Sequence, residues 1–179
     1  MRALLFAPLV LSAFLTACAG FQPLHRAAGD GGSLAPLSQV SVAVGYPDDA
    51  DDKRAAYLIR QALESRIGED DAASRYLLRL TPRVRRSGLA VGRDDVASRF
   101  DYTIATRYQL VERATGATVS GGTLYNTASF GAPRDPYGRI SAELNAAEQA
   151  SGAAADALVT ELALHFADIE AEGTERSAE

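Results

Sequence analysis

The chain has 179 residues, of which 47% are hydrophobic, so it can build the core of one packed domain. Its formal net charge of −5 argues against a general nucleic-acid binder, because neutralising phosphates requires a basic surface. One cysteine and two histidines exclude an internal disulfide and leave little material for metal or nucleophilic catalysis.

The chain begins with the pattern of a secretion signal. Arg2 is followed by an apolar stretch over residues 3–14, which is shorter than the about 20 residues of a membrane-spanning helix. Small residues then precede Cys18. We expect a signal peptide over residues 1–17. The alternative is an ordinary secreted protein that keeps an unmodified thiol.

The stretch Leu15-Thr16-Ala17-Cys18 resembles the lipobox of bacterial lipoproteins. The resemblance implies that Cys18 is acylated and becomes the mature N-terminus. Stable anchoring takes more than one acyl chain, so a multiply acylated cysteine would hold the protein on a membrane. Residue 19 is alanine and not aspartate, which by the sorting rule of enterobacterial lipoproteins implies the outer membrane, on its periplasmic face, in a Gram-negative bacterium.

A domain over residues 37–170 is predicted after a tether. Residues 18–36 form the lipidated N-terminus and a stretch rich in glycine, alanine and proline, "RAAGDGGSLAP". Valines then alternate in "QVSVAVG", which predicts a first strand. The acidic stretch "PDDADDKR" leads into an amphipathic helix from Lys53 to Ile67, with Gly68 at its C-cap.

Two long runs alternate apolar and polar residues, "RYLLRLTPRV" and "RFDYTIATRYQLV", and predict strands with one buried side. Pro82 indicates that the first of them lies at an edge or carries a bulge. They are joined through "RRSGLAVGRDD", a hairpin or long loop. A fourth strand is predicted from Ala117 to about Thr127, and the glycine pair 121–122 could bend it.

A helical period then extends from Ser141 to Ile169, about 43 Å of helix, which Gly152 could kink. Residues 171–179 are a polar tail. The order β-α-β-β-β-α predicts an α+β fold, a two-layer αβ sandwich in which two helices pack on one face of a four-stranded sheet. One sequence does not fix the order of the strands in that sheet.

Charge is distributed unevenly. Residues 75–113 contain nine arginines and four carboxylates, a local charge of +5, so the remainder carries −10. The pattern alone favours a solvated sheet face whose arginines keep an edge soluble. The sharper alternative is a patch that meets anionic groups, because the guanidinium fork pairs well with phosphate and carboxylate.

No catalytic constellation stands out. His165 lies on the last helix with Glu161 one turn before it, at the border of the apolar stripe, and His25 lies in the tether. The GxSxG, HExxH and P-loop motifs are absent from the sequence. We therefore expect neither an enzyme nor a bound cofactor or metal. A lipid-anchored hydrolase that uses His165 is the weaker alternative.

Several stretches together resemble the LPS-assembly lipoprotein family (LptE), the small partner of the outer-membrane lipopolysaccharide translocon. "ACAGFQPLH" is similar to the family's lipidated N-terminus, although Ala19 is inserted and His25 replaces an aromatic residue. "YLLRLTPRV" and "SRFDYTIATRYQLVERATG" are similar to its two central strands. "LYNTASFGAPRDPYGRISAELNAAEQA" is similar to its last strand, loop and alanine-rich final helix.

The resemblance implies a sandwich that plugs the β-barrel subunit of the translocon, helps that barrel fold and contacts lipopolysaccharide. The arginines would then meet acidic walls of the barrel or lipid phosphates. Our candidates for ligand contact are Arg83, Arg85 and Arg86, where the strand enters the loop. The competing interpretation is an auxiliary lipoprotein of an ABC-type lipid transport system, with no barrel partner.

Overall fold

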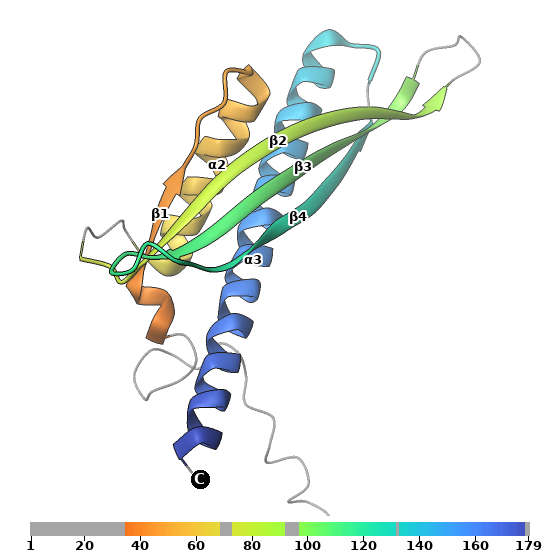
Figure 1. Ribbon diagram of the computed structural model, residues 1–179. Coiled ribbons are helices and arrows are strands. Elements are labelled where there is room, and N and C mark those ends of the chain that lie inside the picture. The colour runs from red at the N-terminus through yellow and green to blue at the C-terminus, as the bar shows by residue number, and fades with distance from the viewer. Residues whose placement is uncertain (1–34, 69–72, 92–96, 132, 178–179) are drawn as a thin grey trace, which may run out of the picture.

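The computed structural model describes residues 35–68, 73–91, 97–131 and 133–177, so Cys18, the signal peptide and His25 lie outside the described residues. It confirms the predicted α+β sandwich, with two helices behind a four-stranded sheet (Figure 1). In chain order the elements are the 3-10 helix η2 (Ala35–Gln39), strand β1 (Val40–Val44), helix α2 (Ala50–Ile67), strands β2 (Tyr76–Val91), β3 (Ala97–Glu112) and β4 (Thr118–Gly131), and helix α3 (Pro136–Ser177).

The strands lie in the sheet in sequence order, β1-β2-β3-β4. β1 runs parallel to β2, and the other neighbours are antiparallel. β1 pairs with Tyr76–Leu80, and beyond Leu80 no described strand pairs with this edge of β2. Pro82 lies just beyond the end of that pairing, where its missing N–H removes no ladder bond, and β2 also has a register shift near Gly88. The proline therefore marks a local edge of an otherwise interior strand.

Helix α2 begins three residues earlier than the sequence predicts because Asp49 caps it. The Asp49 carboxylate accepts hydrogen bonds from the backbone N–H groups of Asp51 (2.9 Å) and Asp52 (3.3 Å). At the other end Gly68 has a φ of 98°, in the left-handed region that favours glycine, and its N–H donates to the carbonyl of Glu64. The predicted C-cap is confirmed.

Helix α3 is longer than predicted at both ends and continues through Gly152. It begins at Pro136, whose missing N–H suits a first helical position, and the carboxylate of Asp135 accepts the N–H of Gly138 (2.6 Å). Its 42 residues correspond to about 63 Å, and its last turns run past the sheet (Figure 1). Residues 171–177, which the sequence assigns to a polar tail, are part of this helix.

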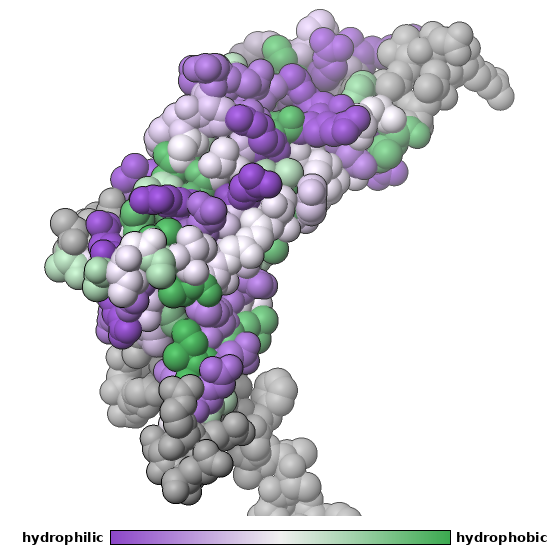
Figure 2. Space-filling view, in the orientation of Figure 1, coloured by the Kyte–Doolittle hydropathy of each residue, from purple (hydrophilic) through white to green (hydrophobic). Residues whose placement is uncertain are grey.

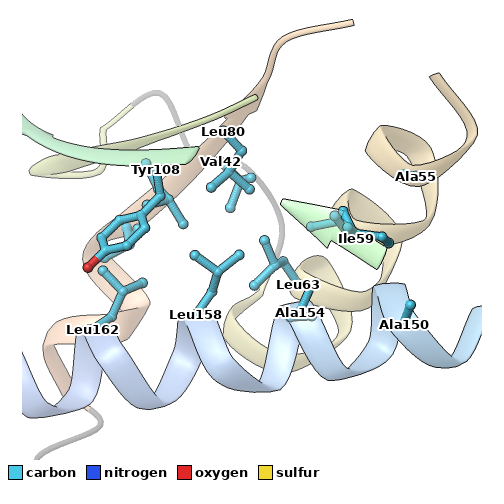
Figure 3. Close-up of a cluster of buried hydrophobic side chains, with 14 of the residues drawn as sticks. Val42, Ala55, Ile59, Leu63, Leu80, Tyr108, Ala150, Ala154, Leu158 and Leu162 are labelled. Atoms are coloured by element: carbon cyan, nitrogen blue, oxygen red, sulfur yellow. The ribbon is translucent and has the colours of Figure 1, made fainter. Parts of the chain in front are cut away.

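The core lies between the helices and one face of the sheet (Figure 3). Alanines on α3 leave room for larger side chains from α2 and the strands, which lets the helix approach closely. The side chains that meet there are Val42, Leu80 and Tyr108 from the sheet, Ala55, Ile59 and Leu63 from α2, and Ala150, Ala154, Leu158 and Leu162 from α3.

Truncation of Leu158 tests this arrangement. Leu158 is fully buried, so Leu158→Ala should lower the free energy of unfolding by about 2–5 kcal/mol through lost burial and a residual cavity. Leu164→Ala is the matched control on the same helix, because Leu164 is 52% exposed, and it should change stability by less than about 0.5 kcal/mol. Chemical denaturation followed by circular dichroism measures both. Equal losses would contradict the packing.

Candidate binding surface

No described helix or strand covers the face of the sheet opposite the helices, and this face carries five arginines at outward-pointing positions. We call these five arginines the outer arginine face. Figure 2 views the molecule with the strands in front and shows strongly hydrophilic side chains over this face of the sheet. Among the described outward-pointing residues of β2, β3 and β4, between residues 77 and 131, only Asp101 is acidic. Its carboxylate accepts a hydrogen bond from the hydroxyl of Ser129 (2.6 Å). The outer arginine face consists of Arg79, Arg83, Arg85, Arg99 and Arg107.

Strand register brings these charges together. Arg107 on β3 lies opposite Thr81 on β2, so Arg79 and Arg83 are its two diagonal neighbours. Diagonal Cβ atoms on a sheet lie roughly 7–8 Å apart. Guanidinium groups carried at such neighbouring positions repel one another weakly, because water and salt screen exposed charges. An anionic group bound over Arg107 would relieve this repulsion, which gives the face a chemical preference for phosphate or carboxylate.

Arg83 is tied to the edge of the sheet. Its Nη1 donates to Oδ2 of Asp52 (2.9 Å), and Oδ1 of the same carboxylate accepts the backbone N–H of Val84 (2.6 Å). Asp52 is only 6% exposed. The Asp52 carboxylate therefore takes the place of a pairing strand at Val84, beyond the end of β1. The charge of Arg83 is partly balanced by the same carboxylate.

Arg86 points to the helix side of the sheet, opposite to Arg83 and Arg85. Its two terminal nitrogens donate to Asp51 at the start of α2 and to Glu143 on α3, each at 2.5 Å. These partly exposed pairs form a network that joins both helices to β2. The structure thus brings Arg83 and Arg85 together on one face and separates Arg86 from them. Their role in ligand contact stays a prediction.

Four arginines of the outer face have no ion-pair partner among the described residues: Arg79, Arg85, Arg99 and Arg107. Sequence reasoning selected Arg85 but not Arg79 or Arg107. The alternation of β2 and β3 already placed both on the polar side of the sheet, so it was the signal that could have found them.

The described side chains around His165 do not pair it with an orienting carboxylate. Glu161 accepts a hydrogen bond from the hydroxyl of Tyr108 (3.1 Å), and burial raises the pKa of that phenol. The buried Nε2 of His165 has no hydrogen-bond partner among the described residues, and the centroid of its ring lies 5.7 Å from that of Phe166. At the other end of the sheet, burial raises the pKa of Tyr102 to about 12, with the charge of Asp51 adding to the effect.

In the portion of the chain that the structure covers, no group of three His, Cys, Asp or Glu side chains is placed to hold a metal ion. No helix among the described residues has the length and apolarity needed to cross a membrane.

Comparison with solved structures identifies proteins that share this fold. A candidate lipoprotein from Caulobacter crescentus CB15 has a TM-score of 0.62 and 23% identity, over 76% of this chain and 96% of its own. Rare lipoprotein B from Shewanella oneidensis has a TM-score of 0.56 and 15% identity, over 73% and 98%. A minor lipoprotein from Acinetobacter baumannii has a TM-score of 0.51 and 16% identity, over 70% and 90%. No family model and no curated sequence matches the chain, so this likeness establishes the fold.

The three arginines chosen from the sequence should respond differently to charge reversal. Arg83→Glu and Arg86→Glu each set a new carboxylate beside existing ones and should lower the free energy of unfolding by about 1–3 kcal/mol. Arg85→Glu breaks no contact and should leave stability within about 0.5 kcal/mol. Thermal and denaturant unfolding of the three variants decides the matter. A large loss in Arg85→Glu would mean that this side chain has a structural partner.

Proposed function

We propose that the chain is an outer-membrane lipoprotein, anchored through Cys18, that occupies and helps assemble the β-barrel subunit of the lipopolysaccharide translocon. In that place it supports insertion of lipopolysaccharide at the cell surface. The observation that carries this proposal is the two-sided sandwich. Helices bury one face of the sheet, and the other face exposes guanidinium and hydroxyl groups along three long strands.

A body that fills a wet pore needs such a surface. An apolar outer face would require a dry partner, whereas exposed arginines, threonines and serines suit a hydrated barrel wall. The four arginines without a described partner offer guanidinium forks to acidic side chains of that wall or to phosphates of lipid A. The lipobox-like stretch that ends at Cys18, and three fold relatives that are named as lipoproteins, support the anchored state.

The partner is tested by affinity purification from detergent-solubilised envelopes of the host. We expect recovery of a large β-barrel protein, and depletion of the chain should lower both the assembled barrel and surface lipopolysaccharide. Recovery of an inner-membrane permease would instead support an auxiliary lipoprotein of an ABC-type system. Normal levels of barrel and surface lipopolysaccharide after depletion would contradict the translocon role.

A matched pair of double variants links this role to the outer arginine face. Arg79→Glu with Arg107→Glu should fail to restore surface lipopolysaccharide in depleted cells and should weaken binding of the purified lipid by tenfold or more. Lys53→Glu with Arg54→Glu changes the net charge equally on the exposed side of α2 and should behave as the unmodified chain. If both double variants restored surface lipopolysaccharide and bound the lipid equally, the outer arginine face would not be the functional surface.

The anchor has its own test. Mass spectrometry of the chain extracted from membranes should find residues 1–17 removed and several acyl chains on Cys18. Cys18→Ser should yield a form released from the membrane fraction. An unacylated mature terminus on the unmodified chain would refute the anchored state.

A further inference from the structure

The outer edge of β4 is long, regular and uncharged. Over its 14 residues, TVSGGTLYNTASFG, it contains neither a charged residue nor a proline. Its register with β3 is unbroken from Ser120 to Gly131. Natural sheets normally protect such an edge with charges, prolines, bulges or very short strands. β4 lacks these protections along this stretch.

The other edge of the same sheet has them. β1 has only five residues. Beyond the end of β1, the outer edge of β2 offers fewer N–H groups to an added strand. Pro82 has none, and the N–H of Val84 donates to the carboxylate of Asp52 (2.6 Å). The two edges of one sheet thus differ: the β1 side is protected, whereas the β4 edge is not. This contrast indicates that the unprotected edge of β4 has a use.

The hydrogen-bond pattern identifies which groups of β4 point outward. The N–H of Arg113 donates to the carbonyl of Arg75 (2.9 Å), so odd-numbered residues of β3 face β2. Because facing alternates along an antiparallel strand, even-numbered residues of β3 bond to their even-numbered partners on β4. The odd-numbered residues 121–131 therefore present N–H and C=O groups to the outer edge, where no described strand pairs with them.

The charges beside this edge define what an added strand should carry. Its outward side chains would lie one strand spacing from Thr123 and two spacings, about 9.6 Å, from Arg107. Between Arg99 and the edge stands Gly131, which has no side chain to cover that guanidinium. Arg99 and Arg107 have no ion-pair partner among the described residues. Acidic side chains at alternate positions of an added strand would complement both.

Tyr125 supplies an anchor at the middle of the edge. Its side chain is 73% exposed on the outer face, and its neighbour on β3 is the small Ala105. An aromatic side chain in this position contributes cross-strand packing to whatever lies beside it. A second copy of β4 would bring no carboxylate to Arg99 or Arg107, since β4 is uncharged.

We propose that β4 is a docking edge for an extended segment of a partner protein that adds a fifth strand, with acidic side chains at alternate, outward-pointing positions. Backbone hydrogen bonds to residues 121–131 hold the segment, and Arg99 and Arg107 select its charge. The proposal requires neither that the partner be the β-barrel subunit nor that the chain bind a lipid.

Amide hydrogen exchange measured by NMR tests the proposal, with a synthetic ten-residue peptide that alternates threonine and glutamate as the probe. At about 1 mM peptide we expect the amides of Thr123, Tyr125 and Thr127 to exchange at least tenfold more slowly. The amide of Leu124, already bonded to β3, should not change. No change at the odd positions, or an equal effect from a threonine–lysine peptide, would overturn the proposal. Protection that rises with the protein's own concentration alone would identify a second copy and overturn it as well.

Two threonines that flank Arg107 at the same level of the sheet give a matched pair. Thr123→Glu places a repelling carboxylate at the edge and should abolish the protection by the glutamate peptide. Thr81→Glu adds the same charge on the far side of Arg107 and should retain it. Thr123→Pro removes an outward N–H without removing a bond to β3 and should also abolish it. Thermal unfolding verifies that each variant is folded, and equal loss in both glutamate variants would refute the docking edge.

Discussion

The structure depends on the fact that the two described α-helices both cover the same face of a long sheet. β2 and β3 pair over almost their whole length, and side chains alternate strictly between the faces. The even-numbered residues, such as Leu78, Leu80 and Ile104, lie in the core. A slip of one residue would bury arginines and expose leucines, so the hydrophobic pattern fixes the register. The same register necessarily gathers the arginines on the side that no described helix covers.

The acidic start of α2 balances part of that charge. Asp49 caps the helix, and Asp51 forms an ion pair with Arg86. Asp52 pairs with Arg83 and accepts the backbone N–H of Val84 at the edge of β2. Three neighbouring carboxylates thus serve the helix, the edge and the contact between layers. Arg79, Arg85 and Arg107 have no such partner among the described residues. On the outer face, the start of α2 therefore pairs with Arg83 alone.

Much of the fold could be predicted from the sequence, because alternation and helical period report directly on which side chains are buried. Gly68 likewise marks the end of α2 through a backbone conformation that glycine favours. The parallel pairing of β1 with β2 could not be predicted, since it joins segments whose patterns are alike for either direction. The extension of α3 to Ser177 was missed because its last residues have no apolar period and include Gly173 and Thr174, which are weak helix formers.

For the candidate site, the sequence could indicate the face on which Arg79, Arg83, Arg85 and Arg107 lie. It could not indicate which of them are engaged, because Asp52 meets Arg83 only where β1 stops at Val44. Arg86 was grouped with Arg83 and Arg85 because all three lie where the strand enters the loop, although neighbouring residues on a strand point to opposite faces. Strand alternation, applied strictly, would have separated them.

The geometry also bears on how the proposed anchor would act. η2 packs against α3, so the chain enters the domain beside that helix. The 17 residues from Cys18 to residue 34 span at most about 60 Å when fully extended, comparable with the about 63 Å length of α3. A lipid on Cys18 would therefore hold the domain near a membrane without fixing its depth or orientation. In this arrangement the proposed anchor would raise the local concentration of the domain, and the proposed contacts of the outer arginine face and the edge of β4 would determine its position against a partner.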